Sequence, residues 1–274
     1  MMLKYRLITA FMLMPLVLWV LFFASPVVFS LTLLLIDLLA AREWARLIGF
    51  SLNAQWLFSA LHMLLLALLL LVLDQLRFTA PLTLGLGLLS WIIAFINLYA
   101  FAQKKDQVFD HPLFKITQPF FLLIPFCVAI NTVRNLPEGD LYLLLLLGLV
   151  WAADTGAYFI GRLWGKHKLA EKISPKKTLE GLYGALATSV LIAFIAGFIR
   201  HDTLMTFLFL LLLCLSTTFF SVLGDLFESL LKRKADVKDS GRLLPGHGGL
   251  LDRIDGLIAA TPLFALGVLV MARM

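Results

Sequence analysis

The sequence predicts an all-α, polytopic integral membrane protein in which residues 1–274 form a single transmembrane domain. Of the 274 residues, 61% are hydrophobic and 15% are charged, and the mean hydropathy is +0.95. An average soluble domain carries about 25% charged residues, so a soluble fold of this size would have too few polar side chains to cover its surface. The same hydrophobicity excludes intrinsic disorder. The two cysteines, Cys127 and Cys214, lie within apolar runs and exclude a disulfide-stapled domain.

Apolar stretches of nearly membrane-spanning length predict about nine transmembrane helices. A spanning helix needs about 20 mostly apolar residues. Helices are expected because an isolated strand in lipid leaves its backbone groups unpaired, and runs such as 64–73 lack the alternation of barrel strands. The stretches lie near residues 7–23, 26–41, 56–73, 82–101, 116–133, 141–160, 181–199, 204–223 and 256–272. The first follows Lys4 and Arg6 but lacks a convincing cleavage site, so we interpret it as a retained helix.

The basic residues fall on one side of these spans. With the N-terminus in the cytoplasm, 19 of the 23 Lys and Arg residues lie in cytoplasmic segments. Cytoplasmic loops of membrane proteins carry such an excess, so the distribution predicts a cytoplasmic N-terminus and supports nine spans. Two cytoplasmic loops, 161–180 and 224–255, are long and rich in charge. We expect any active site to lie in these two loops.

Loop 224–255 carries six acidic residues beside its six basic ones. Asp225 and Glu228, and likewise Asp252 and Asp255, are spaced i,i+3. Each pair shares a helix face if the flanking helices extend into the loop. Carboxylate oxygens beside a phosphate-bearing substrate are typical of a Mg²⁺ site. Alternatively, acidic residues at a helix start only favour the helix dipole.

Residues 245–249, Pro-Gly-His-Gly-Gly, form a flexible turn between these acidic pairs. Glycines let the backbone approach a ligand closely, and their exposed N–H groups can bind an anion. An ordinary turn before a helix, with His247 hydrogen-bonded or facing solvent, is the alternative.

Loop 161–180 is strongly basic, with six Lys and Arg residues against two Glu. Ser174 and Pro175 are typical of a helix N-cap followed by proline at the first helical position. Lys176 and Lys177 are therefore expected at a helix N-terminus, where phosphate binds readily. Alternatively, these lysines only hold the loop in the cytoplasm.

Three ionisable residues lie inside apolar stretches. An acid within a membrane segment is costly and usually faces a polar cavity. We therefore interpret Asp154, near the cytoplasmic end of its stretch, as facing the site rather than snorkelling to the interface. Asp37 is expected to pair with Arg42 or Arg46. His62 is expected to be structural, without polar neighbours.

The region around the last two predicted helices carries polar residues and glycines at fixed spacing. They are Ser229, Lys232, Arg233, Lys238, Asp239, Gly241, Leu244, Pro245, His247, Gly248, Gly249, Asp252, Arg253 and Asp255. This pattern resembles the signature of the phosphatidate cytidylyltransferases, also called CDP-diglyceride synthases. Residues 154–158 and 174–181 also resemble this family, whereas the N-terminal third matches only as hydrophobic helices.

The resemblance implies that the CMP group of CTP is transferred to phosphatidate, which gives CDP-diacylglycerol and pyrophosphate for phospholipid synthesis. It implies a Mg²⁺ cofactor, allows a monovalent cation such as K⁺, and places the active site on the cytoplasmic face of the inner membrane. The implied partners are CTP, phosphatidate and membrane lipids, without nucleic acid, and a homodimer is expected from the family. The alternatives are a CTP-dependent transferase for another lipid acceptor and a transporter of phosphate-bearing lipid or Mg²⁺.

The resemblance and the spacing together assign roles to particular residues. The lipid phosphate is expected to attack the α-phosphorus of CTP directly, without a protein nucleophile. Metal binding is assigned to Asp225, Asp252 and Asp255. Catalytic roles are assigned to Asp225, Lys238, His247, Asp252 and Arg253. Substrate binding is assigned to Asp154, Ser174, Lys176, Lys177, Lys232, Arg233, Gly248 and Gly249.

Overall fold

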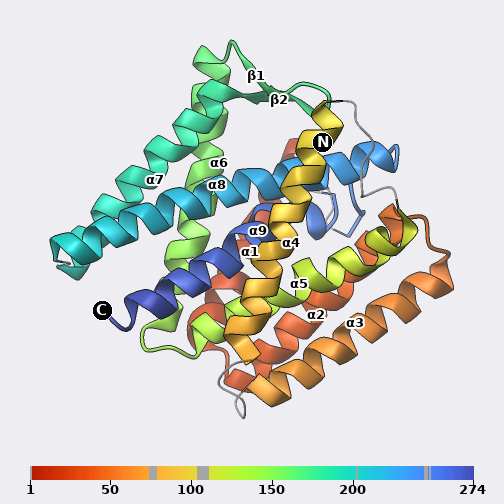
Figure 1. Ribbon diagram of the computed structural model, residues 1–274, viewed down its shortest axis with the longest axis horizontal. Helices are drawn as coiled ribbons and strands as arrows, with labels where there is room; N and C mark the ends of the chain where they lie inside the picture. The colour runs from red at the N-terminus through yellow and green to blue at the C-terminus, as the bar shows by residue number, and fades with distance from the viewer. Residues whose placement is uncertain (1, 74–78, 104–110, 202, 244–245, 247) are drawn as a thin grey trace.

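The computed structural model describes residues 2–73, 79–103, 111–201, 203–243, 246 and 248–274. Within them it contains nine helices and one small antiparallel sheet (Figure 1). The helices are α1 (Met2–Phe23), α2 (Pro26–Leu47), α3 (Leu52–Leu73), α4 (Thr79–Ala102), α5 (Pro112–Arg134), α6 (Gly139–Trp164), α7 (Leu179–Arg200), α8 (Leu204–Lys234) and α9 (Leu251–Met271). The strands are β1 (Lys168–Ala170) and β2 (Ser174–Thr178).

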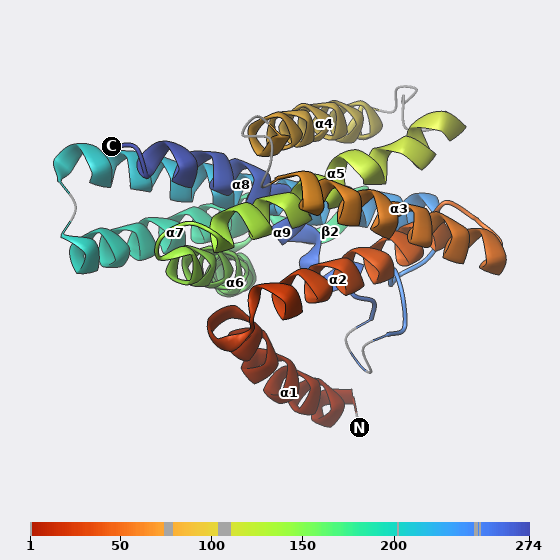
Figure 2. The same ribbon diagram turned by 90° about the horizontal axis from the view of Figure 1, so that it is seen from below.

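Seven helices, α3 to α9, are long and apolar enough to cross a membrane. Helix α2 reaches 22 residues but carries four charged side chains in its C-terminal half. In α1 the apolar stretch Phe11–Phe23 is shorter than a span, and this helix packs on α2 and α6 at one edge of the molecule (Figure 2). The chain is therefore an integral membrane protein, while the count of nine spans and the cytoplasmic N-terminus stay predictions.

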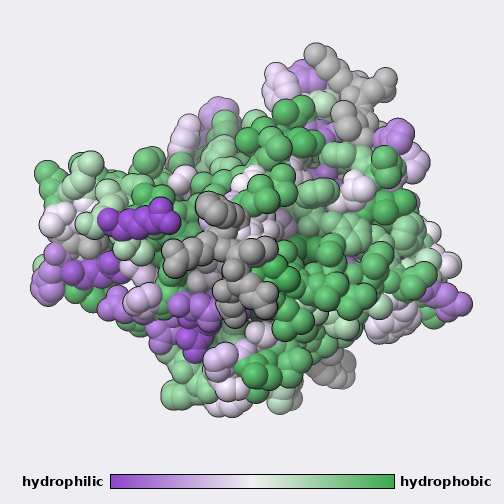
Figure 3. All heavy atoms as spheres, turned by 60° about the horizontal axis from the view of Figure 1, so that its bottom comes forward, coloured by the Kyte–Doolittle hydropathy of each residue, from purple (hydrophilic) through white to green (hydrophobic). Residues whose placement is uncertain are grey.

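Large apolar side chains cover the outside of the helices. They dominate the face shown in Figure 3, where hydrophilic residues gather in patches toward the edges of the view. Such a surface would promote association in water but is expected in contact with lipid. The most buried spans are α5 and α9, which form the centre of the bundle.

The segments predicted to be cytoplasmic meet at one end of this bundle. Lys172, in the turn between β1 and β2, donates from Nζ to the carbonyl of Ala102 at the end of α4 (2.8 Å). Arg233, near the end of α8, donates from Nε to the carbonyl of Ile173 in the same turn (3.2 Å). Helices α4, α6 and α8 therefore end on the same side of the bundle.

The segment around Ser174 is a strand, and the prediction of a helix start there is wrong. Pairing with β1 keeps residues 174–178 extended. Helix α7 begins only after Thr178, whose side chain caps it by accepting a hydrogen bond from the backbone N–H of Gly181 (3.1 Å). Lys176 and Lys177 therefore lie on β2 and not in the first turn of a helix.

Asp37 pairs with His62, so the predicted pairing with Arg42 or Arg46 is wrong. Asp37 Oδ2 lies 2.8 Å from His62 Nδ1, and both side chains are fully buried between α2 and α3. The ring of His62 stacks on that of Phe120 in α5. The two arginines are five and nine residues from Asp37 in sequence, which is not the i,i+3 or i,i+4 spacing of neighbours on a helix face. The partner comes from another helix instead, and His62 is not without polar contact.

Small residues allow α6 and α7 to pack closely. A Cβ atom on Gly184 would lie 2.6 Å from the carbonyl oxygen of Gly156 and 2.6 Å from Cβ of Ile160. A Cβ atom on Gly156 would lie 2.6 Å from Cγ2 of Thr188. Close backbone approach through small residues is a common way for membrane helices to associate.

The α6–α7 contact can be tested with two alanine substitutions. Gly184→Ala should lower the thermal unfolding temperature in detergent, because overpacking typically costs about 1–3 kcal/mol. Gly148→Ala is the matched control on α6, because a Cβ there meets no atom within 4 Å. Equal unfolding temperatures for the two variants, measured by a thermal-shift assay, would contradict the close packing described here.

Candidate active site

A cavity of about 480 Å³ opens between α6, the β-hairpin, α7 and α8. It has a charged part and an apolar part. Its charged lining residues are Asp154, Arg162, Lys176, Lys177 and Asp225. Its apolar and aromatic lining includes Tyr158, Leu169, Leu182 and Val222. Four residues predicted from sequence, Asp154, Lys176, Lys177 and Asp225, therefore line one cavity although they come from three separate elements.

An ion pair crosses the charged part of this cavity. Lys177 Nζ on β2 lies 2.5 Å from Asp225 Oδ2 on α8. Asp225 Oδ1 also accepts a longer hydrogen bond from the hydroxyl of Ser229 (3.4 Å). The carboxylates of Asp154 and Asp255 are near enough to interact electrostatically with that of Asp225. Three acids thus gather around Lys177, and Arg162 and Lys176 add two further positive charges to the lining of the cavity.

Small residues at the crossing of α8 and α9 bring these acids together. A Cβ on Gly224 would collide with the carbonyl oxygen of Asp255, so the two backbones touch at this point. One residue further along α9, a Cβ on Gly256 would lie 2.5 Å from the hydroxyl of Ser221. This close crossing places Asp225 and Asp255 on facing helices beside the cavity.

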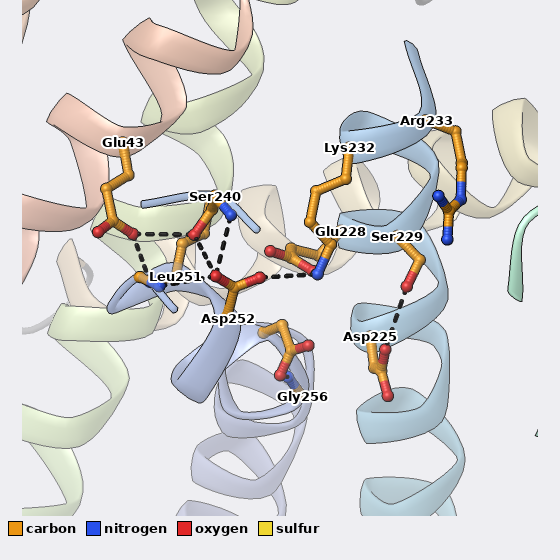
Figure 4. A network of polar contacts seen from close by, with 12 residues as sticks. Glu43, Asp225, Glu228, Ser229, Lys232, Arg233, Ser240, Leu251, Asp252 and Gly256 are labelled. Carbon is orange, nitrogen blue, oxygen red and sulfur yellow. Dashed lines mark hydrogen bonds and ion pairs between the residues drawn. The ribbon is translucent and has the colours of Figure 1, made fainter. Parts of the chain in front are cut away.

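A second polar cluster lies at the junction of α8, the loop 235–250 and α9 (Figure 4). Lys232 on α8 forms ion pairs with Glu228 on the same helix and with Asp252 on α9, where Nζ lies 2.7 Å from Oδ1. Asp252 Oδ2 accepts hydrogen bonds from the backbone N–H of Ser240 (2.9 Å), its hydroxyl (2.9 Å) and the N–H of Gly249 (2.8 Å). Asp252 thereby joins both ends of the loop to α8.

Glu43 on α2 belongs to this second cluster and was not identified from the sequence. Its carboxylate accepts hydrogen bonds from the N–H groups of Leu250 (3.0 Å) and Leu251 (2.8 Å), and Oε2 lies 3.0 Å from the hydroxyl of Ser240. The side chain is buried, with Glu43 only 9% exposed. The signal used for Asp154 does not apply, because Glu43 follows the apolar stretch 26–41 and lies between Arg42 and Arg46.

Two of the predicted phosphate-binding residues on α8 have other partners. Lys232 forms ion pairs with the carboxylates of Glu228 and Asp252, and Arg233 donates to the backbone carbonyl of Ile173 in the hairpin turn. Ser174 is half-buried on β2. Lys232 thus helps to position α9 and Arg233 the hairpin, and the contact of all three side chains with substrate stays a prediction.

The remaining predicted residues lie on or next to the loop before α9. Lys238 is exposed, and Arg253 is exposed on the first turn of α9, where its charge acts on Asp154. Gly248 has a φ of +87°, which favours glycine, and a Cβ there would lie 2.7 Å from Asp252 Oδ2. Gly249 is buried and donates to Asp252 as described. His247 lies outside the described residues.

The predicted metal ligands are divided between the two clusters. Asp225 lines the cavity and Asp255 lies next to Asp225, whereas both oxygens of Asp252 are bound by Lys232, Ser240 and Gly249. In the part of the chain that the structure describes, no three His, Cys, Asp or Glu side chains are grouped to hold a metal ion. The assignment of Mg²⁺ ligands stays a prediction.

Comparison with known proteins covers nearly the whole chain. The family model of the cytidylyltransferase family matches residues 4–271. Relatives named phosphatidate cytidylyltransferase are 37% identical in Haemophilus influenzae, over 96% of this chain and 98% of the relative, and 37% identical in Pseudomonas aeruginosa, over 96% of each. The relative of the same name in Bacillus subtilis is 39% identical over 60% of this chain and 61% of its own length. The resemblance seen in the C-terminal motif thus extends through the N-terminal helices, and the chain belongs to the cytidylyltransferase family.

Proposed function

We propose that the protein is a phosphatidate cytidylyltransferase, which transfers the CMP group of CTP to phosphatidate and releases pyrophosphate. This reaction makes CDP-diacylglycerol for phospholipid synthesis. The full-length relatives carry this name. The structural observation that supports it most is the cavity itself, because its charged part suits phosphates and its apolar part suits a lipid.

The two parts of the cavity suggest how the substrates lie. Lys176 and Lys177 present ammonium groups to the phosphates of both substrates. The apolar part is bordered by α6 and α7, whose outward faces expose Tyr158 and Tyr183 toward the region expected to hold lipid. We propose that phosphatidate enters sideways along these helices, with its phosphate toward the lysines.

The main obstacle to the reaction is the repulsion between two anionic substrates. An oxygen of the phosphatidate phosphate forms a new bond to the α-phosphorus of CTP. The bond from that phosphorus to the bridging oxygen breaks, and pyrophosphate leaves with the bonding electrons. The lipid phosphate is already ionised near neutral pH, so no protein nucleophile is needed. The protein has to align the two substrates and to offset their negative charge. Lys176 and Lys177, which line the cavity, can offset that charge.

The donors at the cavity fit Mg²⁺ in chemistry. Mg²⁺ in nucleotide sites usually takes one or two carboxylates and completes its shell with water and substrate phosphates. Asp225 and Asp255 provide such carboxylates beside the lysines, so a full protein cage is not required. When bound there, Mg²⁺ would neutralise phosphate charge. Asp252 fits less well, because Lys232 and backbone donors hold its oxygens. A role for K⁺ stays a prediction.

We further propose that the protein lies in the inner membrane with this cavity facing the cytoplasm, where CTP is made available. The support is the 19-to-4 distribution of basic residues together with the meeting of the predicted cytoplasmic segments at one end of the bundle. A homodimer remains an expectation from the family.

Purified protein in detergent should release pyrophosphate only when CTP, phosphatidate and Mg²⁺ are all present. Lys176→Ala should lower kcat/KM about tenfold or more, because a hydrogen bond to a charged group contributes about 1.5–3 kcal/mol. Lys166→Ala is the matched control, since this exposed lysine of the same loop does not line the cavity. Faster turnover with another lipid phosphate, such as a polyprenyl phosphate, would contradict the assigned acceptor.

The Mg²⁺ dependence of two aspartate variants separates metal binding from positioning. In Asp225→Asn, the Mg²⁺ concentration that gives half-maximal activity should rise at least several-fold, because a ligand is weakened. In Asp252→Asn, kcat should fall while that concentration stays within about twofold of wild type. The measurement is a Mg²⁺ titration of pyrophosphate release. If the Mg²⁺ concentration for half-maximal activity rises strongly in Asp252→Asn and not in Asp225→Asn, Asp252 rather than Asp225 binds the metal.

Labelling of single introduced cysteines tests the orientation. Asn135, at the end of α5, and Lys166, before β1, are exposed and lie at opposite ends of α6. A membrane-impermeant maleimide added to intact spheroplasts should label Asn135→Cys but should label Lys166→Cys only after permeabilisation. The native Cys127 and Cys214 are buried and give a low background. The opposite labelling pattern would place the cavity outside the cell.

A further inference from the structure

We propose that Glu43 is a positioning residue of the transferase, which holds the start of α9 and the loop before it in the catalytic arrangement. The inference rests on the proposed function and adds to it a residue from the N-terminal third of the chain. Glu43 lies on α2 and outside the motif that resembles the family. It does not line the 480 Å³ cavity, so its effect must pass through other residues.

Glu43 caps a helix that has no side-chain cap of its own. The N-cap residue of α9 is Leu250, which cannot accept a hydrogen bond through its side chain. The N–H groups of Leu250 and Leu251 donate instead to Oε1 and Oε2 of Glu43. A carboxylate is favoured at a helix N-terminus by the helix dipole. Within the described residues no lysine or arginine forms an ion pair with Glu43, so these donors account for the burial of its charge.

A shared hydroxyl connects Glu43 to the charged residues of α8 and α9. The hydroxyl of Ser240 lies 3.0 Å from Glu43 Oε2 and 2.9 Å from Asp252 Oδ2, so its single proton lies between two carboxylates. Asp252 in turn is paired with Lys232 (Figure 4). One chain of contacts therefore runs from α2 through the loop and α9 to α8.

Two glycines of the motif are required by the position of Glu43. A Cβ on Gly241 would collide with Glu43 Oε1, and a Cβ on Gly249 would collide with both Glu43 Oε2 and the hydroxyl of Ser240. Neither glycine has a positive φ, so neither is required by its own backbone conformation. The motif thus leaves space for a carboxylate that comes from a distant part of the chain.

The position of the α9 start determines where Asp255, which lies next to the cavity residue Asp225, is placed. Asp252 and Asp255 are one helical turn apart in α9, so a shift of the first turn moves both. Lys176 and Lys177 are held separately, because both lie on β2 of the hairpin and Lys177 also pairs with Asp225. Loss of Glu43 should therefore lower kcat strongly and change the KM for CTP little.

The test compares Glu43→Gln with Asp37→Asn. Glutamine keeps the size of the side chain but puts an amide NH₂ where an acceptor is needed, so we expect kcat to fall about tenfold or more and the KM for CTP to change by less than about threefold. Asp37→Asn removes another buried carboxylate from α2 that contacts His62 and not the loop. It should lower the unfolding temperature and leave kcat per folded molecule unchanged. Equal kcat values for the two variants would overturn the proposal.

Hydrogen–deuterium exchange of the peptide covering 248–253 provides a readout independent of activity. Its backbone amides should exchange at least about tenfold faster in Glu43→Gln than in Asp37→Asn, and equal rates would overturn the proposal. If the wild-type protein releases no pyrophosphate from CTP and phosphatidate, the proposed function fails, and the exchange rates still decide whether Glu43 holds the loop.

A second variant covers the case in which Glu43→Gln does not fold. Ser240→Ala removes only the shared hydroxyl, and it should lower kcat and speed exchange in the same peptide to a smaller degree. Unchanged kcat and unchanged exchange in Ser240→Ala would overturn the proposal.

Discussion

The ion pairs of Lys232 are the interaction on which the arrangement of the site depends. This one ammonium group contacts two carboxylates, Glu228 on its own helix and Asp252 on α9, and all three side chains are largely shielded from water. Removing one partner of a buried ion pair leaves an uncompensated charge, which typically costs about 3–5 kcal/mol. Lys232 therefore fixes α9 against α8 at the point where the helices leave the apolar core.

The acidic residues of this end of the bundle fall into two groups with different partners. Glu228 and Asp252 both pair with Lys232, and Glu43 accepts from N–H groups at the start of α9, so these acids maintain the structure. Around the cavity, Asp154 and Asp225 lie among the basic side chains of Arg162, Lys176 and Lys177. Carboxylates next to lysines are suited to bind a cation and a phosphate together.

Sequence alone predicted what depends on composition and on residues close together in the chain. The membrane architecture followed from the scarcity of charge, and Asp154 was singled out as an acid within an apolar stretch and Asp225 by its i,i+3 spacing from Glu228. Lys177 was singled out for a helix start that the structure does not have. Contacts between distant segments could not be predicted from one sequence, as the pair of Asp37 with His62 and the hydrogen bond from Leu251 to Glu43 show. The strand at residues 174–178 was missed because its pairing with β1 overrides the local signals of a helix start.

The collision that a side chain at Gly241 or Gly249 would make with Glu43 couples three positions that are far apart in sequence. A change at any of them alters which residues the other two can accept. Among related proteins these three positions should therefore vary jointly, and a chimaera that combines the first helices of one relative with the last helices of another should fail where they disagree. The N-terminal helices are thus a specific structural partner of the C-terminal motif. Other hydrophobic helices of the same length could not replace them.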